Sequence, residues 1–144
     1  MVIGETEELE SNIERFVERV NVYLGMSSEE KVLQYNPTEM VVQVLNSWTG
    51  TVIKMDDLSS GEKQVISLFS YLYLYPEKNI VLIDEPELSL SIEWQRRLLM
   101  DVINSPTCTQ LLAITHSPFI FDNELDPIAG PMLVERTQKV NFDE

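Results

Sequence analysis

The chain has 144 residues, enough for one domain with a hydrophobic core, and its 44% hydrophobic and 24% charged residues are ordinary for a globular protein. Its net charge of -14 is not ordinary, and it argues against direct binding of a nucleic-acid backbone by this chain alone. A single cysteine, Cys108, excludes an internal disulfide. The acidic N-terminus does not resemble a signal peptide, and no apolar stretch approaches the ~20 residues that span a bilayer. A cytoplasmic location is therefore expected.

The N-terminal third predicts one helix followed by a small antiparallel sheet. From Thr6 to Leu24, apolar residues recur every three or four positions, which is typical of a helix with one buried stripe. Gly25 is the expected end of this helix. Short β-prone runs separated by turn residues follow, and they favour an antiparallel meander. These runs are Lys31–Tyr35, Met40–Leu45 and Thr51–Met55.

From Asp56 onward the pattern changes to alternating helices and apolar strands. The predicted helices are Gly61–Tyr75 and Ser91–Ile103, and the predicted strands are Ile80–Ile83 and Gln110–Thr115, with a last short strand at Met132–Arg136. A fully apolar strand is typical of a parallel sheet buried on both faces, so an open parallel sheet is expected. Ligands bind beyond the carboxyl ends of such strands, where Asp84, Glu85 and His116 lie.

The first motif is Leu58-Ser59-Ser60-Gly61-Glu62-Lys63-Gln64, where a helix begins. One interpretation is a capping box, in which Ser59 caps the helix and Glu62 reaches back to it. The other is an anion site, because a Ser-Ser-Gly turn that opens a helix leaves N–H groups free beside small side chains. Gly61 would then let a phosphate approach closely. Both interpretations use the same local geometry and both stay open.

The second motif, IVLIDEPE at residues 80–87, is an apolar strand that ends in two adjacent carboxylates. A polar turn after a buried strand is common, but adjacent carboxylates repel each other unless a cation or water separates them. Asp84 is therefore a candidate ligand for Mg²⁺, and Glu85 is a candidate for polarising an attacking water. In the third motif, ITHSP at residues 114–118, His116 is either structural or a hydrogen-bond donor to a γ-phosphate.

Taken in order, LSSGEKQ, IVLIDEPELSLSIEWQ and ITHSPFIF resemble the signature, Walker B and switch-histidine segments in the C-terminal half of an ABC-type ATPase head. The DEPELSL and THSPFIF segments look most like the RecF, Rad50, SMC and OLD-like branch. Within it, they are most similar to AAA-family (AAA_15/AAA_21-like) ATPases of bacterial anti-phage systems, including the Septu and retron-associated kind. The resemblance covers about residues 56–122.

The resemblance implies an α/β fold that forms part of an ABC-ATPase head. Residues 1–55 would hold the N-terminal helix and the small antiparallel strands, and residues 56–144 would hold a parallel sheet with flanking helices. This second region is the signature, Walker B and H-loop half of the head. Related sequences often have a histidine-proline pair where this chain has Ser91-Ile92.

The resemblance also implies roles for single residues, with ATP and Mg²⁺ as cofactors. Three small residues of the signature would contact the γ-phosphate of an ATP held mainly by the opposite subunit: Ser59, Ser60 and Gly61. Ser89 would lie in the D-loop, where two heads touch. Asp84 would serve Mg²⁺, Glu85 would be the catalytic base, and His116 would be the switch histidine.

No glycine in these 144 residues is followed by Lys-Ser or Lys-Thr, so the P-loop pattern G-x-x-x-x-G-K-[ST] does not occur in them. Without that lysine and its nest of N–H groups, tight nucleotide binding by one chain is not expected. A missing P-loop strand would also leave apolar strand edges and helix faces uncovered.

The leading hypothesis is ATP binding and hydrolysis as the C-terminal part of an ABC-type ATPase, in phage defence or DNA maintenance. Activity would then depend on a P-loop half or second head, in a dimer or hetero-complex. A nuclease effector is a further expected partner, and nucleic acid would be contacted only indirectly. The alternative hypothesis is a non-catalytic module that docks onto an intact ATPase head.

Overall fold

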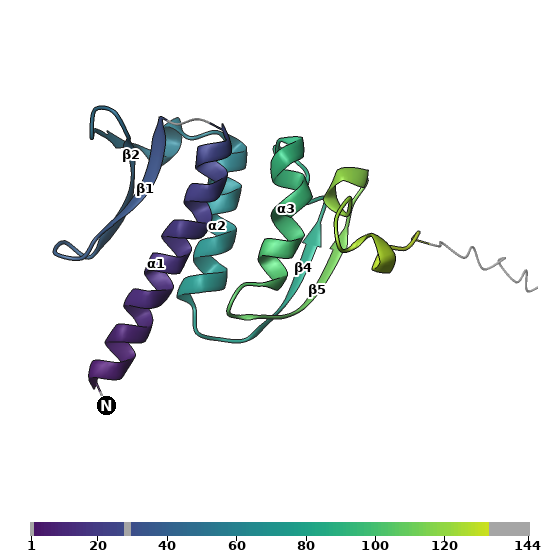
Figure 1. Ribbon diagram of the computed structural model, residues 1–144, viewed down its shortest axis with the longest axis horizontal. Coiled ribbons are helices and arrows are strands. Elements are labelled where there is room, and N and C mark those ends of the chain that lie inside the picture. Colours follow the sequence, from purple (N-terminus) through teal and green to yellow (C-terminus); the bar gives the residue numbers. More distant parts are fainter. Residues whose placement is uncertain (1, 28–29, 133–144) are drawn as a thin grey trace, which may run out of the picture.

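The structure is a computed structural model that describes residues 2–27 and 30–132. This part of the chain contains three α-helices, a three-stranded antiparallel sheet and a two-stranded parallel sheet (Figure 1). In chain order the elements are α1 (Val2–Ser27), β1 (Lys31–Asn36), β2 (Val41–Asn46), β3 (Val52–Ile53), α2 (Ser60–Leu74), β4 (Asn79–Asp84), α3 (Ile92–Ile103) and β5 (Cys108–Ile114).

Helix α1 is longer than the sequence predicts, because it continues through Gly25 to Ser27. The predicted stop at Gly25 is therefore wrong. A glycine inside a helix costs roughly 1 kcal/mol relative to alanine. The helix tolerates this cost because the neighbouring Leu24 is buried in the core and the Ser27 hydroxyl donates to the Leu24 carbonyl oxygen at 3.1 Å.

The predicted antiparallel meander is confirmed. Strand β1 pairs with β2 along its whole length, and β2 pairs with β3. The third strand is shorter than predicted, since only Val52 and Ile53 pair with β2. The chain then turns through a 3₁₀ helix at Met55–Asp57, in which the Asp57 N–H donates to the Lys54 carbonyl, and this turn redirects it toward α2.

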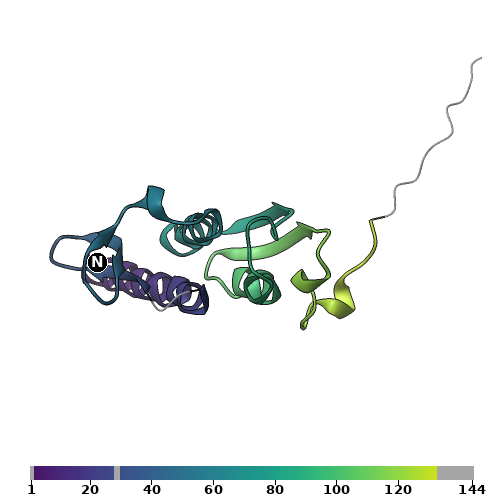
Figure 2. The same cartoon turned by 90° about the horizontal axis from the view of Figure 1, so that it is seen from above.

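Strands β4 and β5 run parallel and are connected through α3, as the alternating pattern predicts. The sheet has these two strands in the described residues, and α3 packs against β5. Figure 2 shows α3 on one side of the sheet, with no helix of residues 2–27 or 30–132 on the other side. Val81, Ile83 and Leu111 pack against the hydrophobic core.

The opposite face of this sheet is apolar and open. Ile80, Leu82, Leu112 and Ile114 are 65%, 72%, 61% and 39% exposed. We call these four side chains the open sheet face. The prediction that the β4 run is buried on both faces is therefore wrong within residues 2–27 and 30–132, where one helical layer covers only one side of the sheet.

The hydrophobic core joins the N-terminal elements to the rest of the chain. Tyr23 lies at its centre, with its ring 5.4 Å from the ring centroids of both Phe69 on α2 and Trp94 on α3. Buried residues from α1, β1, β2, α2 and α3 complete it, among them Phe16, Val20, Leu33, Val44, Val65, Leu98 and Val102. Three helices therefore share one core.

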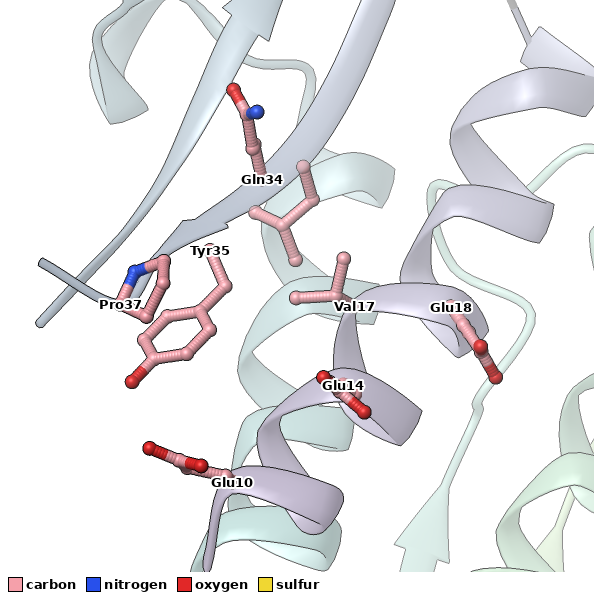
Figure 3. Close-up of a pocket in the computed structure, with 8 residues that line it drawn as sticks. Glu10, Glu14, Val17, Glu18, Gln34, Tyr35 and Pro37 are labelled. Carbon is pink, nitrogen blue, oxygen red and sulfur yellow. The ribbon is translucent and has the colours of Figure 1, made fainter.

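A groove of about 520 Å³ lies between α1 and β1 (Figure 3). Glu10, Glu14 and Glu18 line its α1 side, and Tyr35 and Pro37 line the other. Three carboxylates along one wall concentrate negative potential there, which repels phosphate groups. This groove is therefore unsuited to a nucleotide.

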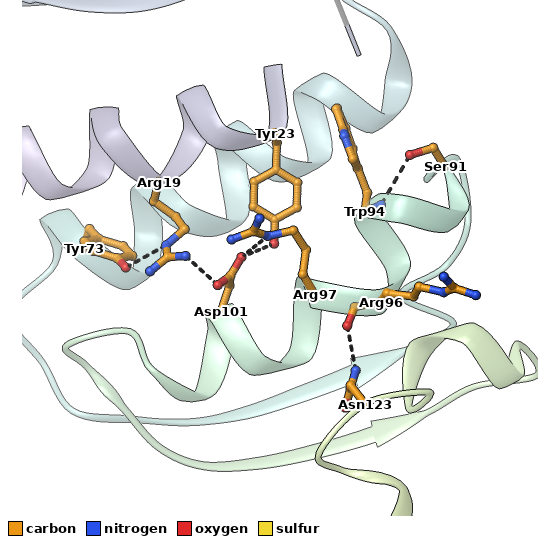
Figure 4. A network of polar contacts seen from close by, with 9 residues as sticks. All are labelled: Arg19, Tyr23, Tyr73, Ser91, Trp94, Arg96, Arg97, Asp101 and Asn123. Carbon is orange, nitrogen blue, oxygen red and sulfur yellow. Dashed lines mark hydrogen bonds and ion pairs between the residues drawn. The ribbon is translucent and has the colours of Figure 1, made fainter. Parts of the chain in front are cut away.

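A buried carboxylate, Asp101 on α3, connects all three helices (Figure 4). It accepts hydrogen bonds from Tyr23 at 2.7 Å and from Arg97 at 2.8 Å, and it forms an ion pair with Arg19 of α1. Arg19 also donates to the Tyr73 hydroxyl of α2 at 3.4 Å. Burial and the nearby Asp101 carboxylate raise the pKa of Tyr23, so its hydroxyl stays protonated and donates.

The predicted strand at Met132–Arg136 lies outside the described residues except for Met132. No helix within residues 2–27 and 30–132 is both long enough and apolar enough to cross a membrane.

Candidate functional site

The Leu58–Gln64 motif forms the predicted capping box at the start of α2. The Ser59 hydroxyl accepts the Glu62 N–H at 3.2 Å, and the Glu62 carboxylate accepts the Ser59 N–H at 2.8 Å. Lys31 of β1 pairs with the same carboxylate at 2.9 Å. Burial would raise the pKa of Glu62, but the hydrogen bonds from Lys31 and Ser59 outweigh it and hold that pKa below its usual range.

Gly61 is required by packing within the chain. A Cβ at this position would lie 2.3 Å from the Ser89 carbonyl oxygen and 3.4 Å from Leu90 Cδ2. The space that the sequence suggests for a phosphate at Gly61 is therefore filled on this side by the loop after β4. The N–H groups of Ser60 and Gly61, the first two of α2, have no acceptor among the described residues, and of these two residues Ser60 is exposed whereas Gly61 is buried.

Gly61→Ala should lower the free energy of unfolding by about 1–3 kcal/mol, because overpacking against backbone forces the loop to move. Urea denaturation followed by circular dichroism measures this change. Gly25→Ala is the matched control, since Gly25 is also helical but nothing lies within 4 Å of its added Cβ. That variant should gain up to about 1 kcal/mol. Equal effects of the two substitutions would contradict the close contact between Gly61 and Ser89.

Residues 85–90 form a tight loop that is held at both ends. Glu85 and Ser89 have positive φ angles of 48° and 68°, a conformation that costs non-glycine residues about 1 kcal/mol or more. Gln64 of α2 donates to the Pro86 carbonyl at 3.2 Å, and Gln95 of α3 donates to the Leu90 carbonyl at 2.9 Å. These two amide side chains fix the strained loop against both helices.

The candidate acidic and histidine residues come together at the carboxyl ends of β4 and β5, as expected for a parallel sheet. The Glu85 N–H donates to the Ile114 carbonyl at 2.8 Å, which joins the two strand ends. His116 Nε2 lies 3.5 Å from Glu85 Oε1, and the two side chains are 78% and 41% exposed. Asp84 is the last residue of β4 and is exposed.

A carboxylate that sequence reasoning left without a role, Glu87, connects the two loops. One of its oxygens accepts the His116 N–H at 2.8 Å, and the other accepts the Thr115 hydroxyl at 2.7 Å. Partial burial would raise the pKa of Glu87, but these hydrogen bonds hold it below its usual range. The signal in the sequence was the third carboxylate of DEPE, which falls in the loop after a buried strand.

The structure therefore brings the three motifs to one end of the molecule. The start of α2 contacts the loop after β4 at Ser89, and that loop contacts the turn after β5 at His116. Ser59 and Ser60 are exposed at the start of α2, and Ser89 is exposed in the loop. The Ser59 oxygen is used as the cap acceptor, which leaves its hydroxyl proton able to donate.

The residues present fit Mg²⁺ in part. Asp84 offers an exposed carboxylate oxygen, the ligand type that Mg²⁺ prefers. Within residues 2–27 and 30–132 no group of three His, Cys, Asp or Glu side chains could hold a metal ion. The described residues alone do not supply a complete coordination shell, and Mg²⁺ bound with a nucleotide takes most of its ligands from phosphates and water.

Comparison with known proteins gives one family match. Residues 13–122 match the family described as "AAA domain, putative AbiEii toxin, Type IV TA system". A search of the curated proteins gave no match to this chain. The matched residues include α2, β4, α3, β5 and all three motifs. They cover more than half of the chain, so this protein belongs to the AAA_21 family of AAA-type ATPase domains.

Proposed function

We propose that this chain is the C-terminal part of an ABC-type ATPase head, and that it binds and hydrolyses ATP with Mg²⁺ once a P-loop segment completes it. The observation that carries the proposal is the meeting of three motifs at one end of the β4–β5 sheet. The 3.5 Å distance between His116 Nε2 and Glu85 Oε1 supports assigning His116 as the sensor and Glu85 as the base. Family membership supports a nucleotide-binding function of the ATPase type.

Each candidate site residue has a separate proposed role that follows from the chemistry of its side chain. Glu85 is half-exposed beside an imidazole, where its carboxylate can accept a proton from a water molecule. Asp84, the last residue of β4 and the residue directly before Glu85, can bind Mg²⁺, which neutralises phosphate charge when present. The N–H group of the exposed Ser60 at the start of α2, with the hydroxyls of Ser59 and Ser60, suits the γ-phosphate of a nucleotide across an interface.

The uncovered surface supports dependence on a partner segment. The open sheet face presents four large apolar side chains at strand positions where a second layer would normally pack. A second apolar groove, of about 1090 Å³, runs beside β5 between α3 and residues 118–132, and it reaches His116. A P-loop segment, whether earlier in a longer polypeptide or on a partner chain, would cover the open sheet face and supply the missing phosphate cradle.

The biological setting is proposed from the family and from the sequence resemblance. The family description names a toxin of a type IV toxin–antitoxin system, and the motifs resemble ATPases of anti-phage systems. A role in phage defence or DNA maintenance in the cytoplasm is consistent with both. The net charge of -14 favours nucleic-acid contact through a partner, such as a nuclease effector, over contact by this chain.

Completion with a P-loop segment tests the proposal. A P-loop segment from another AAA_21-family ATPase is co-expressed with this chain or fused to it, and phosphate release is measured with and without Mg²⁺. We expect Mg²⁺-dependent turnover in the completed head and none in the isolated chain. Leu82→Asp on the open sheet face should prevent assembly, measured by co-purification. Met40→Asp is the control, because Met40 is similarly exposed at 67% but lies in the β1–β2 turn.

The alternative is a non-catalytic module that docks onto an intact head, and the open sheet face supports it equally well. One measurement distinguishes the ATPase from the docking module. A completed head that assembles and binds ATP, yet releases no phosphate under any Mg²⁺ concentration, would favour the docking module over the ATPase.

A further inference from the structure

The turn that carries His116 follows directly after the last paired residues of β4 and β5. The last residue pair of β4 and β5 is Asp84 with Ile114, so no strand pairing holds Thr115 or His116. The imidazole is 78% exposed, and packing therefore does little to fix its direction. The backbone of this turn sets the position of the His116 Cβ, and with it the range of positions that the imidazole can reach.

Glu87 supplies that anchor from the loop after β4. Its carboxylate accepts the His116 N–H at 2.8 Å and the Thr115 hydroxyl at 2.7 Å. The Thr115 oxygen in turn accepts the Ser117 N–H at 3.0 Å. Hydrogen bonds to a charged acceptor are shorter and stronger than neutral ones. The carboxylate thus holds the turn at Thr115 and His116, and the Thr115 hydroxyl in turn holds Ser117.

Gln95 completes the support from α3. Its side-chain oxygen accepts the Ser117 hydroxyl at 2.6 Å, while its nitrogen donates to the Leu90 carbonyl at 2.9 Å. The same amide therefore touches the turn after β5 and the loop after β4. Gln95 and Glu87 approach the turn from two different elements.

We propose that Glu87 is a positioning residue. Through the backbone of His116 and the hydroxyl of Thr115, its carboxylate holds the imidazole facing Glu85. The catalytic part of this inference rests on the proposed function, because it concerns the distance between the candidate base and the candidate sensor. The positioning itself is a property of the isolated chain, and it can be measured without any ATPase activity.

The isolated chain offers a clean spectroscopic test, since His116 is its single histidine. In ¹⁵N-labelled protein, Glu87→Gln keeps the side-chain shape but leaves one oxygen in place of two. We expect amide hydrogen exchange at His116 to become about tenfold faster or more, the ratio for a lost hydrogen bond to a charged acceptor. We also expect the nuclear Overhauser contact between the His116 ring and the Glu85 side chain to weaken.

Two comparisons separate positioning from a general effect on folding. Glu77→Gln makes the same charge change at an exposed residue near the opposite end of β4, and it should leave the His116 signals unchanged. Thr115→Val removes the hydroxyl at constant shape and should reproduce part of the Glu87→Gln effect, whereas Thr115→Ser should not. If Glu87→Gln fails to fold, the comparison of Thr115→Val with Thr115→Ser still tests whether the Glu87 contact positions His116.

In a head completed with a P-loop segment, Glu87→Gln should lower kcat about tenfold while the KM for ATP changes little. Unchanged His116 exchange and an unchanged ring contact in Glu87→Gln would overturn the proposal. Altered His116 signals in a completed head that never hydrolyses ATP would instead leave Glu87 as the anchor and refute the ATPase function.

Discussion

Glu85→Gln is expected to reduce ATP turnover by about 10²- to 10⁴-fold in a head completed with a P-loop segment, the range for loss of a general base. Glutamine has nearly the same shape as glutamate, but its amide cannot accept a proton from water. Glu85 adopts a positive φ and lies 3.5 Å from His116, and the substitution should preserve both features. Phosphate release under saturating Mg²⁺ and ATP measures the effect.

Nucleotide affinity separates a lost base from a damaged fold. Glu85→Gln should bind ATP as tightly as the unsubstituted head, because the carboxylate is assigned to the water and not to the phosphates. Glu93→Gln is the matched control, since Glu93 is exposed in the first turn of α3 and should leave turnover unchanged. Undiminished turnover in Glu85→Gln would remove Glu85 from the role of base.

Asp101→Ala is expected to cost about 3–5 kcal/mol of unfolding free energy, which is a large fraction of the 5–15 kcal/mol typical of a domain. Asp101 is 7% exposed and serves Arg19, Tyr23 and Arg97 at once. Its removal leaves two arginines beside each other and a buried hydroxyl without an acceptor. The melting temperature should fall by roughly 10 °C, as measured by scanning calorimetry.

Asp122→Ala is the control, because it removes an ion pair that is exposed instead of buried. Asp122 pairs with Arg96 at 3.3 Å, but the two side chains are 60% and 52% exposed. Exposed pairs contribute about 0–1 kcal/mol, because water screens them and ordering two side chains costs entropy. Similar losses for Asp101→Ala and Asp122→Ala would show that the buried network does not hold the three helices together.

The sequence predicts those features that depend on local periodicity. The apolar stripe of α1, the turn residues of the meander and the alternation from α2 to β5 each lie within one short window, and each appears in the structure. The ends of elements are less predictable. Helix α1 passes through Gly25, since burial of neighbouring side chains outweighs the low helix propensity of one glycine.

Sequence patterns could not predict contacts between segments that lie far apart along the chain. Arg19 meets Asp101 across 82 positions, and the Ser89 carbonyl fills the space beside Gly61. Neither pairing leaves a trace in local spacing. Glu87 was visible only as a further acidic residue, because its function depends on where the turn after β5 comes to lie. The motif residues themselves were placed at the correct strand ends because parallel strands share one carboxyl edge.

The contact between Gly61 and Ser89 has a mechanical consequence. It joins backbone to backbone, so no side chain can rotate to absorb a displacement between them. The first turn of α2 lies directly against a loop that already contains two residues with positive φ, so the backbone of this loop would have to absorb any displacement of the turn. Glu85 is at the start of that loop, four residues before Ser89. The start of α2 and the loop that carries Glu85 therefore pack directly against each other, with no side chain between them to adjust the fit.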